Sequence, residues 1–135
     1  MPTRDPDREF AKALARAADD HKAEDVVVLD LRGISQVTDY FVIVTGFNRR
    51  HLAALREAFV EVQHIEGRNR FGTEGHDDAR WVLLDFGSIV AHAFDKESRD
   101  FYDLELLWGD ARKVTWRVRA SKAKPKPKLK AATGT

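Results

Sequence analysis

Hydrophobic residues at helical spacing predict two long amphipathic helices in this chain. The first covers residues 6–20, with Asp5 as its N-terminal cap. The second is expected to begin after the cap residue Asn48 and to end at Gly67. The hydrophobic positions at three- and four-residue steps are Phe10 and Leu14 in the first helix and Leu52, Leu55, Phe59 and Val62 in the second.

Short runs of β-branched and aromatic residues predict strands at 25–31, 40–45, 81–86 and 88–94, and a shorter strand near 69–73. The first run is hydrophobic almost throughout, which is typical of a strand covered on both faces. A single glycine separates the runs at 81–86 and 88–94, so these two are expected to form a tight hairpin. The first two strands are expected to be antiparallel neighbours. The second would reach the strand near 69–73 by a right-handed crossover if those two are parallel.

Beyond this hairpin the pattern becomes helical again. Asp95 or Glu97 is expected to begin a short helix. A further hydrophobic turn follows, made by Leu104, Leu107 and Trp108. This order of elements indicates an α/β fold with a mixed β-sheet packed with helices.

Charge divides the chain into two parts. All 22 acidic residues lie between Asp5 and Asp110, so residues 1–111, with 14 basic residues, carry a net charge of −8. Residues 112–135 carry nine basic residues and no acidic one, and they alternate Lys with Pro, which predicts a basic, disordered tail after a domain of residues 1–111. The body should attract basic partners and the tail nucleic acid, unless both serve only solubility.

Composition also limits the setting in which the protein works. No run of about 18 hydrophobic residues predicts a membrane span. The first residues do not resemble a signal peptide, and the chain has no Cys, so a reducing cytoplasm is the expected compartment.

No catalytic or metal-binding pattern stands out, and no cofactor is expected. The five His residues lack the spacing of metal ligands. No Ser sits in a nucleophile elbow, and the chain has no Cys that could serve as a nucleophile. Asp30 and Asp85 could serve a Mg²⁺-dependent nucleotidyltransferase acting on RNA or nucleotides, but no Asp-x-Asp pair supports this alternative. The segment 46–51, with Arg49 and Arg50, is expected to be a capped helix start with solvated arginines rather than a phosphate site.

Aromatic and acidic residues are interleaved in the last third of the body. Large aromatic side chains anchor protein interfaces, and flanking carboxylates select a basic partner. Phe94 and Phe101 are expected to lie in the core, whereas Trp81 and Trp108 could belong either to the core or to an interface. The residues concerned are Trp81, Phe86, Phe94, Phe101, Tyr102 and Trp108, with Asp85, Asp95, Asp103, Glu105 and Asp110 among them.

Several segments closely resemble the ribosomal silencing factor family, the iojap-like proteins. They occur in the family's order over roughly residues 8–111. The matching stretches are Asp-Val-Val-Val-Leu-Asp-Leu-Arg-Gly-Ile-Ser at 25–35, Val-Thr-Asp-Tyr-Phe-Val-Ile-Val-Thr-Gly at 37–46, Arg-His-Leu at 50–52, Glu-Gly at 74–75, Trp-Val-Leu-Leu-Asp-Phe-Gly at 81–87, Val-Ala-His-Ala-Phe at 90–94 and Ser-Arg-Asp-Phe-Tyr-Asp-Leu-Glu-Leu-Leu-Trp-Gly-Asp-Ala at 98–111. Phe47 and Asn48 depart from the family, which more often has small hydroxyl residues there.

The resemblance implies a nucleotidyltransferase-like fold without catalytic residues. It also implies a partner, the fourteenth protein of the large ribosomal subunit, a basic β-barrel on the face where the small subunit docks. Binding there would block subunit joining and repress translation, with no cofactor and with homodimers known in the family. The basic tail could add weak contacts with ribosomal RNA.

The contact surface expected from this resemblance combines aromatic anchors, a carboxylate for a basic partner and a hydrogen-bonding histidine. Its residues are Trp81, Asp85, Phe86, His92, Tyr102, Leu104, Leu107 and Trp108. The main alternative remains the Mg²⁺-dependent enzyme described above. A third possibility is a single-stranded RNA binder that uses the tail and the aromatic residues.

Overall fold

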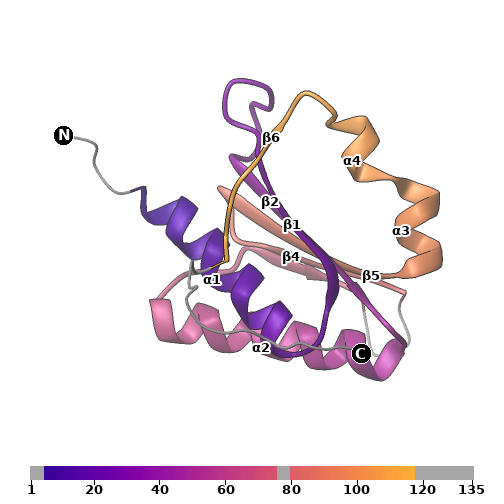
Figure 1. The fold of residues 1–135 in the computed structure, drawn as a ribbon. Coiled ribbons are helices and arrows are strands. Elements are labelled where there is room, and N and C mark those ends of the chain that lie inside the picture. The colour runs from indigo at the N-terminus through magenta and orange to yellow at the C-terminus, as the bar shows by residue number, and fades with distance from the viewer. Residues whose placement is uncertain (1–4, 76–79, 118–135) are drawn as a thin grey trace.

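The computed structural model describes residues 5–75 and 80–117, apart from the side chains of Glu105 and Leu107. Within that part, six strands form one mixed sheet in the order β3-β4-β5-β2-β1-β6 (Figure 1). The strands are β1 (Glu24–Asp30), β2 (Tyr40–Gly46), β3 (Gly72–Glu74), β4 (Trp81–Asp85), β5 (Ile89–Asp95) and β6 (Arg112–Lys113). β2 and β5 pair in parallel, and the other described neighbours are antiparallel.

Two long helices cover one face of this sheet and two short ones lie on the other side (Figure 1). The helices are α1 (Pro6–Asp20), α2 (Arg49–Glu66), α3 (Lys96–Tyr102) and α4 (Leu104–Leu107). The expected caps are confirmed: Asp5 accepts hydrogen bonds from the backbone N–H groups of Asp7 and Arg8, and Asn48 from that of His51. Gly67 ends α2 with φ at 68°, a conformation that favours glycine. None of the described helices is long and apolar enough to cross a membrane.

The core has a large and a small half, one on each face of the sheet. The larger half lies under α1 and α2 and includes Phe10, Leu14, Leu55 and Phe59. The smaller half holds Leu29, Leu31, Ile43 and Phe94 as its fully buried members. The two halves confirm the prediction that the first strand is covered on both faces, and the mixed α/β class with it.

β2 lies between β1 and β5, and its pairing with β5 was not predicted from the sequence. β3 does run in the same direction as β2, so the crossover through α2 joins two parallel strands, but β4 and β5 lie between them. The parallel neighbour of β2 is β5, in register from Tyr40 opposite Ile89 to Gly46 opposite Asp95. β5 has five buried residues among its seven, so it gains more from a central place than β3 does. β3 has three residues, two of them exposed, and occupies the edge next to β4. The β4–β5 hairpin and the antiparallel β1–β2 pair are confirmed.

The folded unit continues past residue 111. β6 pairs with β1, and Val114 and Trp116 are buried against the larger core half. The indole Nε1 of Trp116 donates to the carbonyl of Val26 at 3.2 Å, and Arg117 forms an ion pair with Asp19 at 3.6 Å. The boundary expected at residue 111 is therefore too early, because residues 112–117 belong to the fold. The disorder predicted for the tail concerns residues 118–135, which lie outside the described part.

A polar network joins the start of α1 to the ends of β1 and β2. Arg32 donates two hydrogen bonds to the carboxylate of Asp30, at 2.8 and 2.9 Å. Asp5 accepts from the hydroxyl of Tyr40 at 2.7 Å and from Arg32 at 3.2 Å. The hydrogen bond from Arg32 holds the pKa of Asp30 below its usual value. Burial and the bond to Asp5 raise the pKa of Tyr40 to about 12.

Replacing Asp30→Asn should lower the free energy of unfolding at pH 7 by about 1–2 kcal/mol, because Arg32 loses a charged, bidentate partner. The depressed pKa of Asp30 means that its stabilisation is present above the unfolded pKa of about 3.9 and is lost as the pH falls through the lower folded pKa. Urea unfolding at several pH values should therefore show the difference between the two proteins shrinking as the pH falls below about 4. Asp20→Asn, at an exposed residue, is the matched control; a difference that did not shrink with falling pH would contradict the assignment.

Candidate functional site

The sheet face opposite α1 and α2 carries a row of half-buried residues. On β4, Trp81, Leu83 and Asp85 are half-buried, while the alternate residues Val82 and Leu84 are buried under the helices. Register places Leu83 opposite His92 of β5, and Asp85 opposite Val90, which in turn pairs with Phe41 of β2. This surface, made by alternate residues of β4, β5 and β2 together with α3 and α4, is called the aromatic face below.

Trp81 is the centre of the aromatic face. Its ring lies 4.5 Å from that of Tyr102 and 4.9 Å from that of Phe94, measured between centroids. Its indole Nε1 donates a hydrogen bond to Nδ1 of His92 at 3.1 Å. Arg80, immediately before it, forms ion pairs with Asp95 and Glu97 and so ties β4 to the start of α3. Together these contacts fix the indole in one orientation.

The α4 end of the aromatic face is built around Trp108. Its ring meets that of Phe41 edge to face at 6.0 Å. Leu104 is half-buried and packs on the same small core half. The side chain of the predicted contact residue Leu107 lies outside the described part of the structure. The structure thus brings six predicted contact residues to one face: Trp81, Asp85, His92, Tyr102, Leu104 and Trp108.

Phe86 does not belong to this face. It follows Val82 and Leu84 in the alternation of β4 and its ring packs edge to face on Phe10 of α1, 5.1 Å between centroids. Only 4% of the residue is exposed. The prediction that Phe86 contacts a partner is therefore wrong, and the period of two along β4 carried the information that placed it in the core.

Asp85 lies on the aromatic face and also stabilises the hairpin turn between β4 and β5. Its Oδ1 accepts a hydrogen bond from the backbone N–H of Gly87 at 2.8 Å and so closes the hairpin turn. Gly87 has φ at 87°, and a Cβ there would meet the Phe71 ring at 2.9 Å. The carboxylate therefore both shapes the turn and adds negative charge to the edge of the face.

His92 is more deeply buried than a surface hydrogen-bonding residue would be. The residue is 4% exposed, between Trp81, Phe41 and Phe94, and this burial lowers the pKa of its imidazole to about 4. Because Nδ1 accepts from Trp81, the neutral ring carries its proton on Nε2, which has no hydrogen-bond partner among the described residues. From its buried position His92 thus orients the indole of Trp81 through this hydrogen bond.

Sequence reasoning missed several members of the face. Phe41, Leu83 and Val90 are half-buried on it, and their alternation with buried residues was a usable signal. Phe94 is buried as predicted, but Phe101 is 79% exposed, so its predicted core position is wrong. Leu106 on α4 is 77% exposed and had not been singled out. Short helices give too few residues for helical spacing to identify their buried side.

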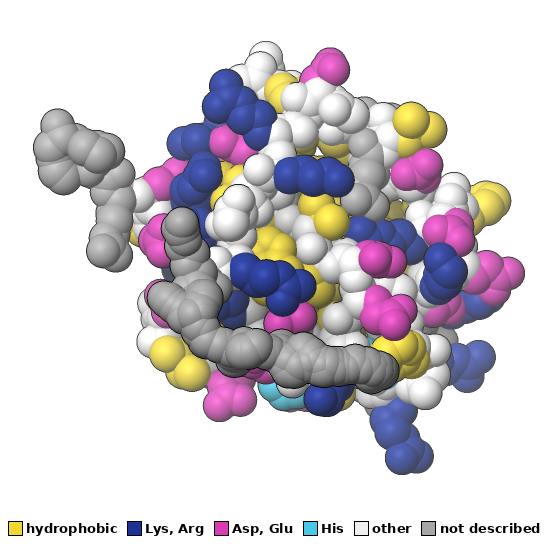
Figure 2. Space-filling view, in the orientation of Figure 1, with side chains coloured by type: hydrophobic (Ala, Val, Ile, Leu, Met, Phe, Trp, Pro, Cys, Tyr) yellow, Lys and Arg dark blue, Asp and Glu magenta, His cyan; other side chains and the backbone are white. Residues whose placement is uncertain are grey.

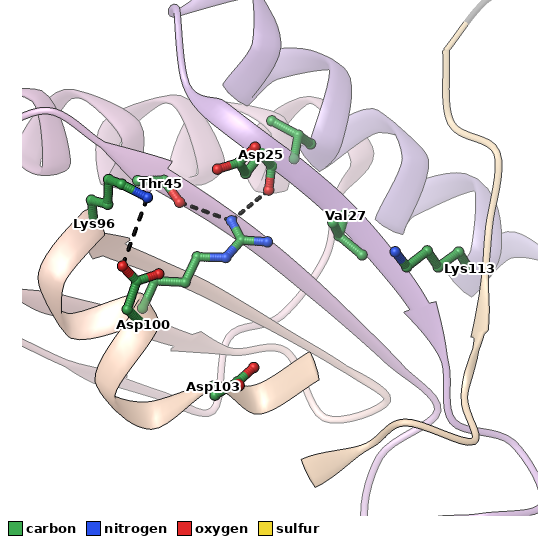
Figure 3. Close-up of a pocket in the computed structure, with 9 residues that line it drawn as sticks. Asp25, Val27, Thr45, Lys96, Asp100, Asp103 and Lys113 are labelled. Carbon is green, nitrogen blue, oxygen red and sulfur yellow. Dashed lines mark hydrogen bonds and ion pairs between the residues drawn. The ribbon is translucent and has the colours of Figure 1, made fainter. Parts of the chain in front are cut away.

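A charged pocket lies between β1, β2 and α3 (Figure 3). Its volume is about 720 Å³, and the Arg99 guanidinium reaches into it, donating to the backbone carbonyl of Asp25 and to Oγ1 of Thr45. Lys96 pairs with Asp100 across one wall at 3.7 Å. The remaining charged residues of the lining are Asp103 and Lys113. Three acidic and three basic residues line this pocket, so its charge is balanced and it is not a carboxylate cluster.

The two aspartates of the enzymatic alternative do not come together. Asp30 ends β1 and Asp85 ends β4, and β5 and β2 lie between these strands. At about 4.8 Å per strand their backbones are roughly 14 Å apart, far beyond the 3.5–4 Å spacing of a two-metal centre. No group of three or more His, Asp or Glu residues in residues 5–75 and 80–117 could hold a metal ion.

Comparison with known proteins decides the family. The model of the family described as "Ribosomal silencing factor during starvation" matches residues 4–134. This chain belongs to the ribosomal silencing factor family. The match extends past residue 111 and takes in the basic tail. The resemblance found in the sequence is thereby confirmed.

Individual relatives agree with this assignment. The ribosomal silencing factor RsfS of Bacillus subtilis is 42% identical over 104 residues, which cover 77% of this chain and 88% of that protein. The mouse protein named "Mitochondrial assembly of ribosomal large subunit protein 1" is 38% identical over 89 residues, 64% of this chain and 39% of its own length. A crystal structure of a protein from Chromobacterium violaceum superposes with a TM-score of 0.72 at 32% identity, covering 84% of this chain and 94% of that one.

The buried imidazole of His92 yields a prediction. Its ring signals in NMR spectra should stay constant from pH 8 to 5 and move only near pH 4, because burial disfavours the charged form. The unfolded state takes up this proton near pH 6.5, so the stability due to neutral His92 is complete above that pH and declines as the pH falls toward 4. A His92→Asn variant assigns the signals. Titration near pH 6.5 would show instead that water reaches the ring.

Proposed function

We propose that this chain represses translation by binding the large ribosomal subunit and keeping the small subunit from joining it. The family supports a ribosome-associated regulator, and the name of the mouse relative refers to the large subunit. The observation that carries the proposal is the aromatic face, where an exposed aromatic surface is bordered by carboxylates. The activity is binding alone, in the cytoplasm, with no chemical step and no cofactor.

The aromatic face has the composition of a protein-docking surface. Tyr102 is 48% exposed beside the fixed indole of Trp81, and Phe101 and Leu106 project further. Aromatic anchors that already sit in one orientation lose little conformational entropy on binding. Trp108 extends the hydrophobic surface along α4. A partner with a shallow apolar depression would fit this raised surface.

The charges around the aromatic face favour a basic partner. Acidic side chains gather beside hydrophobic ones on the side of the molecule that carries α3 and α4 (Figure 2). The exposed or half-buried carboxylates there are Asp85, Glu97, Asp100, Asp103 and Asp110. Glu97 is paired with Arg80 and Asp100 with Lys96, so the negative charge of the border rests mainly on Asp85, Asp103 and Asp110. Such a border speeds the approach of a basic protein and excludes acidic ones.

The partner that best fits this surface is the fourteenth protein of the large subunit, the basic β-barrel implied by the family resemblance. Occupying its exposed side would block the small subunit by steric exclusion, so the free energy of binding sets the degree of repression. The basic residues beyond Arg117 would add weak, salt-sensitive contacts with ribosomal RNA. Homodimers of this chain are a further proposal from the same resemblance.

Removing one anchor should weaken binding to the large subunit. Trp81→Ala and Tyr102→Ala are each expected to reduce affinity by about 30-fold, equivalent to about 2 kcal/mol. Co-sedimentation with separated ribosomal subunits in sucrose gradients measures this, and a subunit-joining assay should show the same loss.

Tyr102→Ala separates binding from folding, since Tyr102 is half exposed whereas Trp81 also supports the small core half. Ile65→Ala is the matched control, because Ile65 is 74% exposed on α2, a helix on the opposite side of the sheet. Equal sedimentation of wild type, Tyr102→Ala and Ile65→Ala would refute the docking surface. A wild-type protein that stays at the top of the gradient would refute the ribosomal function itself.

Charge and shape can be separated at Asp85. Asp85→Asn keeps an Oδ1 that accepts from Gly87 and so preserves the turn, but removes the negative charge. The expected result is an unchanged melting temperature with about three- to ten-fold weaker large-subunit binding, seen mainly as slower association at low salt. Binding kinetics on immobilised large subunits would measure this. An unchanged association rate would show that Asp85 serves the turn alone.

A further inference from the structure

An exposed aromatic platform lies where β2 turns into α2. The Phe47 side chain is 60% exposed, although it follows directly on the buried Thr45 and Gly46. Its ring stacks on the imidazole of His51, with 4.9 Å between centroids and 14° between planes. One side of the phenyl ring is thus supported by the protein.

Hydrogen bonds hold this platform still. The backbone N–H of Phe47 donates to Nδ1 of His51 at 2.9 Å, so the neutral ring carries its proton on Nε2, which donates to the carbonyl of His21 at 2.7 Å. The side chain of Asn48 accepts from the backbone N–H of His51 at 2.8 Å. Gly46 lets Leu52 approach closely, since a Cβ there would lie 2.7 Å from a Leu52 methyl carbon. Backbone and both rings are therefore preorganised.

Two cations flank the platform without a folding role. Arg49 and Arg50 are exposed in the first turn of α2, a turn with no acidic residue, and neither forms an ion pair within residues 5–75 and 80–117. Cations at the start of a helix oppose its dipole, so these two do not serve helix stability. Of the carboxylates on neighbouring strands, Asp95 is paired with Arg80 at 2.7 Å, and Glu24 is exposed on β1 beside Thr45.

We propose that Phe47, His51, Arg49 and Arg50 form a binding surface for single-stranded RNA. An unpaired base would stack on the outer side of the Phe47 ring, and the two arginines would contact the phosphates on either side of it. A single flat ring with adjacent flexible cations suits a base and its phosphates better than a membrane, which favours several apolar side chains. The surface goes beyond the proposed docking of the ribosomal protein and uses none of its residues.

Fluorescence anisotropy with a labelled, unstructured RNA of about twelve nucleotides, within the usual site sizes, tests this proposal on the full chain. Phe47→Ser should weaken binding by roughly five- to 100-fold, the range expected for loss of one stacked base. Phe71→Ser is the matched control. Phe71 is 71% exposed and lies at the opposite end of the strands, next to Gly87. Equal affinities of wild type, Phe47→Ser and Phe71→Ser would overturn the proposal.

The cations are tested by salt dependence. Arg49→Gln with Arg50→Gln should reduce the slope of log affinity against log salt by about 1.4, from two phosphate contacts with a single strand. The pair Arg70→Gln with Arg112→Gln removes the same charge elsewhere and, with the tail intact, should leave the slope unchanged. An equal change of slope in both pairs would overturn a specific role for Arg49 and Arg50.

Two further experiments separate base stacking from charge, and RNA binding from docking on the large ribosomal subunit. Polyphosphate carries negative charge without bases, so Phe47→Ser should bind it as wild type does; equal weakening for polyphosphate and RNA would overturn base stacking. Tyr102→Ala should lose large-subunit binding but keep wild-type affinity for the RNA. If Tyr102→Ala instead lost the RNA as well, the platform would not be an independent site.

Discussion

The parallel pairing of β2 with β5 determines where every other element can lie. Parallel neighbours end on the same side of a sheet, and register places Gly46 directly opposite Asp95. The helices that follow, α2 and α3, must therefore start side by side, yet they leave toward opposite faces (Figure 1). One pairing thus brings together the Phe47 platform, the start of α3 and, through the β4–β5 hairpin, Trp81. The two surfaces proposed to bind partners border the same end of the sheet.

The helices cover the two faces of the sheet unequally, so one face stabilises the fold while the other leaves aromatic side chains partly exposed. α1 and α2 bury the larger core half, so the fold does not depend on the aromatic face alone. The shorter α3–α4 segment leaves Phe41, Leu83 and Val90 half-buried. His92 below and Tyr102 above hold Trp81 between them, which combines packing with presentation to a partner. A partner that docked on Trp81, as proposed, would therefore meet a side chain already held in one orientation.

Most helices and strands could be predicted from the sequence because their signals are local. Caps at Asp5 and Asn48, helical spacing and the β4–β5 hairpin depend on neighbouring residues and were predicted. The partner of β2 was not, because strand order is decided by which strand gains most from central burial, a comparison across the whole chain. The aromatic face was predicted in part: residue types identified Trp81 and Tyr102. Phe86 was misplaced because residue type was weighed above the alternation along β4, and Phe101 because α3 is too short for helical spacing to identify its buried side.

The burial of Trp116 links the integrity of the fold to the completion of synthesis. A nascent chain leaves the ribosome N-terminus first, so the residues that cover the outer edge of β1 emerge after all the other described strands and helices. Any product interrupted before Val114 would retain an open strand edge and an unfilled corner of the core, and such edges pair readily with other chains. Truncated copies would thus be marked by their own exposed edge for aggregation or proteolysis. The chain must be read through Trp116 before the edge of β1 and this corner of the core are covered.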